Sequence, residues 1–115
     1  MNKNRKEHRI TTKAFFDLLA KIENAIYDVD YTNAFKKNVK LCYKRNLDLL
    51  LLVDVIKILA QKGVLPAEYY PHPLKAYNCM ECHITPDWLL LWKQNNNDLI
   101  LILTNTGTHS DLLSK

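Results

Sequence analysis

Hydrophobic residues recur with helical spacing in residues 12–26. Phe15, Leu18, Leu19, Ile22 and Ile26 fall at positions i, i+3, i+4, i+7 and i+11 of this stretch. An α-helix brings such positions onto one face, so the spacing predicts an amphipathic helix. Either Thr11 or Thr12 can accept a hydrogen bond from the first backbone amides and serve as its N-cap.

The hydrophobic period then changes twice within twenty residues. IYDVDYT at residues 26–32 places Tyr27, Val29 and Tyr31 on one side of a period-two alternation, which predicts a strand. Residues 33–45 return to helical spacing, with Phe35, Val39 and Cys42 on one face and Asn33 as the expected N-cap. A helix is therefore predicted over 33–45.

A second helix is predicted from about residue 47 to residue 62, and it ends at Gly63, the usual left-handed C-terminal signal. Its apolar surface is broad and comprises Leu47, Leu49, Leu50, Leu51, Leu52, Val53, Val55, Ile58 and Leu59. Such width predicts burial on more than one side, under a sheet or against a partner. Together with the helix at 33–45 it forms a predicted helical hairpin.

The last part of the chain favours strands. Residues 64–74 are proline-rich and are interpreted as a connection, with His72 held between Pro71 and Pro73. Three strands are predicted at 76–84, 88–94 and 98–104, with the last as a central strand and QNNND as the turn before it. A short tail follows. The order predicts an α+β fold with the helical hairpin on one face of a small sheet.

The length of the chain indicates a single core, and its charge indicates a class of partner. A chain of 115 residues is long enough for a single hydrophobic core. The formal net charge is +4, and five basic residues without an acid fall within ten positions: Lys36, Lys37, Lys40, Lys44 and Arg45. A local basic face favours a polyanion, with nucleic acid first, although a lysine-rich helix face is often merely solvated.

Cysteine count and hydropathy indicate a compartment. The three cysteines are an odd number, the N-terminus has no apolar secretory core, and the longest apolar run, residues 49–53, is too short to span a membrane. We therefore expect a cytoplasmic protein with reduced thiols.

The sequence CMECHI at residues 79–84 contains Cys79-x-x-Cys82-His83, the string that attaches a c-type haem and also half of a typical zinc site. In a strand, however, Cys79, Glu81 and His83 share one face, while Met80, Cys82 and Ile84 share the other. Two cysteines on opposite faces do not converge on one metal.

A strand also separates the roles of these residues. Met80, Cys82 and Ile84 are expected in the core, and Glu81 with His83 is expected to be a solvent-facing functional pair. A zinc ion would need a further ligand from His72, His109 or Cys42. No metal and no other cofactor is predicted.

Three histidines are expected to meet at one end of the sheet. His72 precedes the strands, His83 lies on the first of them and His109 follows the last. With Glu81 and Asp87 nearby, such a group is typical of acid–base chemistry on a polyanion. Trp88 is interpreted equally well as a core anchor or as part of this site.

Longer stretches carry a family resemblance. YTNAFKKNVKLCYKR, LPAEYYPHPLK, ECHITPDWLLLWK and DLILILTNTGTHSDLL, in this order and spacing, resemble the YafQ-type toxins of bacterial toxin–antitoxin pairs, within the RelE/ParE superfamily. The similarity covers roughly residues 27–113. It leaves residues 1–25 as an N-terminal extension with an amphipathic helix, and residues 26–115 as the RelE/YafQ-like toxin domain.

The resemblance implies a RelE-like (microbial RNase-like) fold, with a small twisted antiparallel sheet, a helical hairpin on one face and here an extra N-terminal helix. It implies a type II toxin that stops translation by cutting mRNA in the ribosomal A site. In such endoribonucleases a ribose 2′-OH attacks the adjacent phosphate, which leaves a 2′,3′-cyclic phosphate and a 5′-OH. The implied partners are a cognate antitoxin, the ribosome and mRNA.

The family's motif positions also imply roles for single residues. The implied catalytic set is His72, His83, Asp87 and His109, with His83 and His109 as the proton-transfer groups, and Glu81 and Trp88 support them. Trp88 could stack on a base or brace the site. The expected RNA-binding residues are Lys36, Lys37, Lys40, Lys44, Arg45, Lys75 and Lys93.

The chain departs from the family pattern at two telling positions. Asn105 stands where the family usually has arginine before TGTH, and Leu113 replaces a terminal aromatic residue. Loss of the arginine removes a stabiliser of the phosphorane, for which Lys75 or Lys93 are imperfect substitutes, and predicts reduced activity.

Two alternatives to an active nuclease remain open from the sequence. One is a weakened or inactive remnant that still binds antitoxin. The other is a ParE-like inhibitor of DNA gyrase without nuclease activity, a branch in which the histidine set has no role.

Overall fold

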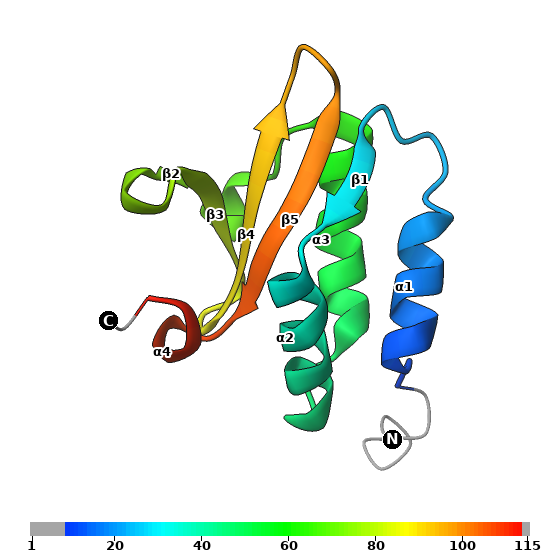
Figure 1. The fold of residues 1–115 in the computed structure, drawn as a ribbon, viewed down its shortest axis with the longest axis vertical. Helices are drawn as coiled ribbons and strands as arrows, with labels where there is room; N and C mark the ends of the chain where they lie inside the picture. Colours follow the sequence, from blue (N-terminus) through cyan, green and yellow to red (C-terminus); the bar gives the residue numbers. More distant parts are fainter. Residues whose placement is uncertain (1–8, 114–115) are drawn as a thin grey trace.

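The computed structural model describes residues 9–113, which build one mixed sheet with three helices on one face (Figure 1). The sheet has the strand order β1-β5-β4-β3-β2. α1, α2 and α3 lie on the same side of this sheet, and the short α4 lies near the lower end of β5. Within residues 9–113, no helix is long and apolar enough to cross a membrane.

Each of the three long helices begins directly after a residue whose side chain caps it. α1 (Thr12–Ala20) is capped by Thr11, and α3 (Leu49–Lys62) is capped by Asp48. α2 (Asn33–Lys44) is capped by Thr32, so the expectation of Asn33 as the cap was wrong by one residue. α1 also ends at Ala20, six residues before the predicted end of this helix at residue 26.

Gly63 ends α3 in the left-handed conformation, with φ +75°, as its position in the sequence predicted. A Cβ at this residue would lie 2.6 Å from the hydroxyl oxygen of Tyr27, which packs directly over it. Both the backbone angle and the close contact therefore require glycine here.

The sheet is not fully antiparallel. β1 (Asp28–Tyr31) pairs in parallel with β5 (Ile100–Gly107), whereas β2–β3, β3–β4 and β4–β5 are antiparallel. The prediction of an antiparallel sheet was therefore wrong at one edge. β5 is an interior strand, between β1 and β4 (Trp88–Asn95), although β4 is the middle one.

The segment before β3 (Cys79–Thr85) holds more structure than predicted. The expected connection contains the 3-10 turn η3 (Ala67–Tyr69) and the strand β2 (His72–Leu74), which pairs with β3. A second 3-10 turn, η4 (Lys75–Tyr77), replaces the predicted start of β3 at residue 76. After β5, the predicted short tail contains the helix α4 (His109–Leu112).

The main core lies between the sheet and the helices. Cys82, Trp88 and Trp92 from the sheet meet Phe35, Val55 and Ile56 from α2 and α3. α3 is buried on two sides, against the sheet and against α1, but Leu50 and Leu51 remain 40% exposed, contrary to the predicted width of its apolar face. Met80 and Ile84 pack against this core with Cys82, as alternation along the strand predicted.

α1 belongs to the same core. Phe15 is fully buried and Leu19 nearly so, and both lie in the cluster that contains Phe35. The rings of Phe15 and Phe16 are in edge contact, and Phe16 also packs against Tyr31 of β1. Residues 1–8 of the predicted N-terminal extension lie outside the described part of the chain.

The opposite face of the sheet is covered only locally. Leu89, Leu91 and Leu112 form a small second cluster beneath α4, with Leu74 and Cys79 packed against it. The polar side chains of β3 lie on this second face, beside the cluster and not under a helix. This leaves room for an open functional site.

We predict that Phe15→Ala lowers the free energy of unfolding by about 3–5 kcal/mol, because a buried aromatic ring leaves a cavity when it is removed. Leu18→Ala, on the exposed side of the same helix, should cost less than about 1 kcal/mol. Urea unfolding followed by circular dichroism measures both. Equal, small losses would show that α1 contributes nothing to the stability of the core.

Candidate active site

Three imidazole rings stand in a row at one end of the second face. His72 comes from β2, His83 from β3 and His109 from the start of α4. The ring centroids of His72 and His83 are 6.3 Å apart, and those of His83 and His109 are 5.5 Å apart. The structure thus brings together the three histidines singled out in the sequence, with His83 in the middle.

The carboxylate of Glu81 lies close to both His72 and His83. It lies directly opposite His72 in the β2–β3 ladder, and its Oε1 is 2.8 Å from Nε2 of His72. The same oxygen is 4.0 Å from Nε2 of His83. Only 3% of Glu81 is exposed, so the expectation that Glu81 faces solvent was wrong. The strand β2, which the sequence did not predict, brings His72 across its carboxylate.

Backbone carbonyls orient two of the imidazoles. Nδ1 of His72 is 2.8 Å from the carbonyl oxygen of Tyr70, and Nδ1 of His83 is 3.3 Å from that of Pro86. A carbonyl oxygen can only accept, so Nδ1 of each ring carries the proton and donates. Each ring consequently turns its Nε2 toward Glu81.

The contact between His72 and Glu81 is within hydrogen-bond distance. Oε1 of Glu81 is 2.8 Å from Nε2 of His72, and Nδ1 of the same ring lies against the carbonyl of Tyr70. The other carboxylate oxygen, Oε2, is buried and makes no hydrogen bond within residues 9–113.

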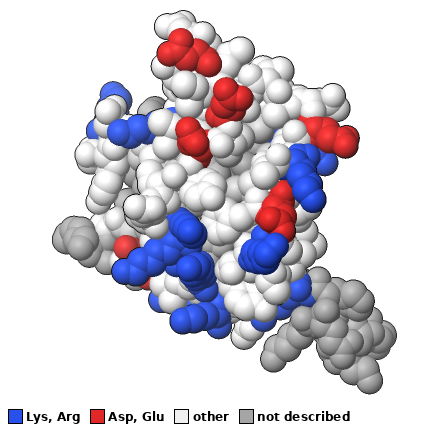
Figure 2. All heavy atoms as spheres, turned by 45° about the vertical axis from the view of Figure 1, so that its right-hand side comes forward, with Lys and Arg blue, Asp and Glu red and all other residues white. Residues whose placement is uncertain are grey.

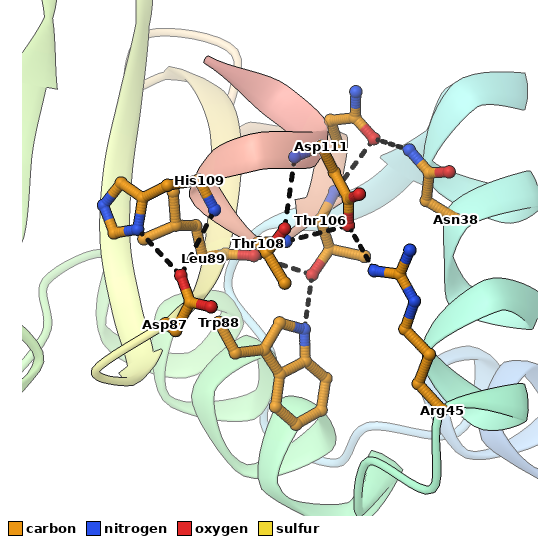
Figure 3. A network of polar contacts seen from close by, with 10 residues as sticks. Asn38, Arg45, Asp87, Trp88, Leu89, Thr106, Thr108, His109 and Asp111 are labelled. Atoms are coloured by element: carbon orange, nitrogen blue, oxygen red, sulfur yellow. Dashed lines mark hydrogen bonds and ion pairs between the residues drawn. The ribbon is translucent and has the colours of Figure 1, made fainter. Parts of the chain in front are cut away.

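Asp87 accepts two hydrogen bonds from His109. The β3–β4 ladder shifts register between His83 and Thr85, and the turn that follows presents Asp87. Its Oδ1 accepts from Nδ1 of His109 at 3.1 Å and from the backbone amide of His109 at 3.4 Å (Figure 3). These hydrogen bonds lower the pKa of Asp87 below its usual value. His109 is thereby left with a free lone pair on Nε2.

Trp88 braces the site from within the core. It is 1% exposed, and its indole Nε1–H donates to the hydroxyl of Thr106 at 2.9 Å. The same hydroxyl donates to the carbonyl oxygen of Leu89 at 2.7 Å, which ties β5 to β4 (Figure 3). The suggestion that Trp88 stacks on a base is therefore wrong, because its ring is covered.

A capping box fixes the start of α4. The hydroxyl of Thr108 accepts from the amide of Asp111, and the carboxylate of Asp111 accepts from the amide of Thr108. Nη1 of Arg45 lies 2.7 Å from Oδ2 of Asp111 and lowers the pKa of that carboxyl. α2 is thus linked to the helix that carries His109 (Figure 3).

Asn105 lies just before this turn and does not reach the histidines. Its side-chain oxygen accepts from the amide group of Asn38 at 2.6 Å and from the backbone amide of Thr106 at 3.0 Å. The position where the resembling family usually carries an arginine therefore holds a neutral link between α2 and β5.

The lysines of α2 form an exposed basic face. Lys36, Lys40 and Lys44 follow one another at i, i+4 and i+8, with Lys37 beside them. Figure 2 shows Lys and Arg side chains gathered over the lower part of one face, where α2 lies in Figure 1. We call the exposed side chains of Lys36, Lys37, Lys40 and Lys44 the α2 basic face.

Lys75 and Lys93 lie away from the three imidazoles. Lys93 is four residues along β4 from Leu89, the partner of His83, which is about 13 Å at the usual strand rise. Lys75 follows β2 at the end opposite His72. The suggestion that either replaces the missing arginine has no support in this geometry.

The cysteines occupy separate environments, as alternation predicted. Cys82 is buried in the main core, and Cys79 packs beside the second cluster on the other face. Burial raises the pKa of the Cys82 thiol to about 12 and that of Cys42 to about 11. Both thiols therefore remain protonated at neutral pH and act as small apolar groups.

Several residues that orient the site were not found from the sequence. Thr106 and the carbonyls of Tyr70 and Pro86 act through backbone geometry or a single hydroxyl, which no residue pattern marks. The Thr-His-Ser-Asp sequence at residues 108–111 did carry a signal, because threonine followed three residues later by an acid is a capping box.

Comparison with known families gives a consistent match. A family model described as "Bacterial toxin of type II toxin-antitoxin system, YafQ" matches residues 27–114. Two curated relatives, both named mRNA interferase toxin YafQ, come from Escherichia coli strains BL21-DE3 and K12. They are 38% and 37% identical to this chain over 90 residues, which span 74% of this chain and 94% of theirs.

Solved structures agree with these matches. A chain in the crystal structure of the E. coli DinJ–YafQ complex superposes with a TM-score of 0.71 at 34% identity, over 76% of this chain and 99% of that chain. A metal-bound toxin from Helicobacter pylori superposes with a TM-score of 0.70 at 34% identity, with the same coverage.

We predict that Thr106→Val destabilises the fold by about 2 kcal/mol, because the indole N–H of Trp88 and the carbonyl of Leu89 both lose their buried partner. Thr106→Ser keeps the hydroxyl and should lose only about 1 kcal/mol for the missing methyl group. Urea unfolding of the two variants beside wild type measures the difference. Similar losses for Val and Ser would mean that the hydroxyl is unimportant.

Proposed function

Because the chain belongs to the YafQ family of bacterial type II toxins, we propose that it is an mRNA endoribonuclease that cuts within the ribosomal A site and halts translation. Its substrate is a single-stranded codon held by the cytoplasmic ribosome. It uses the 2′-OH of one nucleotide as the nucleophile on the next phosphate. A cognate antitoxin neutralises it, as the complex of the E. coli YafQ with DinJ suggests.

One observation carries this proposal. His72, His83 and His109 stand side by side, with Nδ1 of the first two directed at backbone carbonyls and Nδ1 of His109 directed at the carboxylate of Asp87. Cleavage through the 2′-OH needs a base for that hydroxyl and an acid for the leaving 5′-oxygen. A row of imidazoles with fixed tautomers supplies both.

His109 is the proposed general base. Asp87 accepts from its Nδ1–H, so Nε2 offers a lone pair to the 2′-OH, and the carboxylate stabilises the imidazolium that forms. About half of the His109 side chain is exposed, which allows a substrate to approach it.

His83 is the proposed general acid. Its Nε2 lies 4.0 Å from Oε1 of Glu81, and in the proposed mechanism the imidazolium form of His83 carries the transferred proton on this nitrogen. The proton then passes to the 5′-oxygen as the P–O bond breaks. His72 completes the group by contacting Oε1 of Glu81 through its Nε2 and holding that carboxylate in place.

Less positive charge stabilises the phosphorane here than an arginine would provide. Asn105 is neutral and bonded to Asn38, and Arg45 is engaged with Asp111. The positive charge must come chiefly from the imidazolium groups. We therefore propose a nuclease that is slower than one with arginine at position 105.

The α2 basic face is the proposed anchor on ribosomal RNA. Its four lysines are exposed, point away from the core and carry no acid among them. Phosphate contacts of this kind position an enzyme without reading sequence. The assembled histidine row favours the nuclease over an inactive remnant or a gyrase inhibitor, for which these contacts would have no use.

We predict that His83→Ala and His109→Ala each abolish A-site cleavage, measured by primer extension on a defined mRNA with purified ribosomes. A 5′-bridging sulfur at the scissile bond separates their roles, because a thiolate leaves without an acid. This substrate should restore cutting by His83→Ala and leave His109→Ala inactive. Rescue of His109→Ala alone would reverse the two assignments.

The same assay tests the function itself. Wild-type protein that is folded by circular dichroism but makes no cuts would contradict the nuclease and favour the remnant. Asp87→Asn should cut far more slowly than wild type, because an amide can donate to His109 and disturb its tautomer.

We predict that Lys36→Gln, Lys40→Gln and Lys44→Gln, combined, weaken binding to ribosomes and lower the slope of log affinity against log salt by about one for each lysine. The binding is measured in the His109→Ala background, so that mRNA remains intact. Lys57→Gln, an exposed lysine on α3, is the matched control and should leave the slope unchanged. An unchanged slope in the triple variant would remove α2 from the ribosome contact.

A further inference from the structure

A cavity of about 460 Å³ opens beside the histidine row, lined by Glu68, Tyr70, His83, Ile84, Thr85 and Pro86. We propose that this cavity, the Tyr70 slot, binds a nucleobase of the mRNA next to the scissile phosphate, with the ring of Tyr70 as the stacking surface. The inference rests on the proposed nuclease function and names the part of the substrate that this side of the site holds.

Tyr70 is held in an unusual position for an aromatic residue. Its backbone is left-handed, with φ +50°, a conformation that bulky side chains seldom adopt. Yet 69% of the residue is exposed, so burial of the ring does not offset the energetic cost of this backbone conformation. The carbonyl oxygen of Tyr70 orients His72, and the ring of Tyr70 contacts His83. Strain kept next to a reactive group favours a functional role.

The contact with His83 fixes where the slot lies relative to the chemistry. The rings of Tyr70 and His83 meet edge to face, with centroids 5.9 Å apart. His83 therefore belongs both to the slot and to the histidine row, so a group in the slot is adjacent to the reacting phosphate. That group is the base of a neighbouring nucleotide.

The lining of the slot selects a base and not a phosphate. Ile84 and Pro86 give apolar walls, and among the described residues no lysine or arginine lines the slot. Glu68 at its rim repels a phosphate. Single-stranded RNA is read in this way, with splayed bases stacked on aromatic side chains while basic residues elsewhere hold the backbone.

Glu68 also gives the slot a preference among bases. A carboxylate only accepts hydrogen bonds, and guanine offers it two adjacent donors, N1–H and the N2 amino group. Uracil offers one donor between two carbonyl oxygens, which the carboxylate repels. The slot should thus favour guanine and disfavour uracil.

The first test is steady-state cleavage by Tyr70→Ala, Tyr70→Phe and Tyr77→Ala on ribosomes that present different A-site codons. Loss of stacking should lower kcat/KM for Tyr70→Ala roughly ten-fold, mostly through KM, and flatten the preference for guanine. Tyr70→Phe keeps the ring and should stay within about two-fold of wild type. Tyr77→Ala is the matched control, an exposed tyrosine outside the slot.

Two outcomes of this test would overturn the proposal. One is cleavage by Tyr70→Ala with the wild-type rate and codon distribution. The other is an equal loss in Tyr70→Phe, which would assign the effect to the hydroxyl and not to stacking. Glu68→Gln should weaken the preference for guanine, and an unaltered preference would remove Glu68 from base selection.

The second test does not depend on cleavage and so separates the slot from the nuclease function. Guanosine 3′-monophosphate and ribose 5-phosphate are titrated against His109→Ala and followed by NMR. Only the guanosine compound should shift the Ile84 and Thr85 amides and the Tyr70 ring, and Tyr70→Ala should remove these shifts. Equal shifts with ribose 5-phosphate would show that a phosphate or sugar, and not a base, enters the slot.

Discussion

The alternation of side chains along β3 is the constraint on which the rest of this structure depends. Within Cys79–Thr85, one set of residues builds the core against the helices and the other builds the histidine row. Cys82 and Glu81 are neighbours in sequence and are both buried, but they face opposite sides of the sheet. A slip of one residue in the β3–β4 register would place Glu81 in the apolar core and expose Cys82, so packing and chemistry fix the same register.

The parts of the fold that follow hydrophobic periodicity could be predicted from the sequence. The helices, the hairpin of β4 and β5 and the division of β3 into two faces all rest on a repeated pattern of residue types. The parts that could not be predicted depend on contacts between distant segments. The parallel pairing of Asp28 with Ile100 and the β2 strand at His72 have no local signal, because each is decided by a partner strand.

The site shows the same division. The residue types of His83, Asp87 and His109 mark an acid–base site, and their place at one end of the sheet follows from the predicted strands. Burial of Glu81 could not be predicted, since it depends on the unforeseen strand β2. The indole N–H of Trp88 is oriented by the hydroxyl of Thr106, and an isolated threonine is uninformative in a sequence. The sequence therefore marked the proposed reacting groups better than the groups that orient them.

The parallel pairing of β1 with β5 has a consequence for the order of folding. The two strands are about 70 positions apart in the chain, and every other element of the sheet is made between them. Closing so large a loop is slow, and synthesis delivers β5 long after β1. During translation, α1 and the α2–α3 hairpin can pack early, but β1 waits as an unpaired strand until β5 arrives. The edge of the sheet that β1 forms is thus completed only after β2, β3 and β4 have all been synthesised.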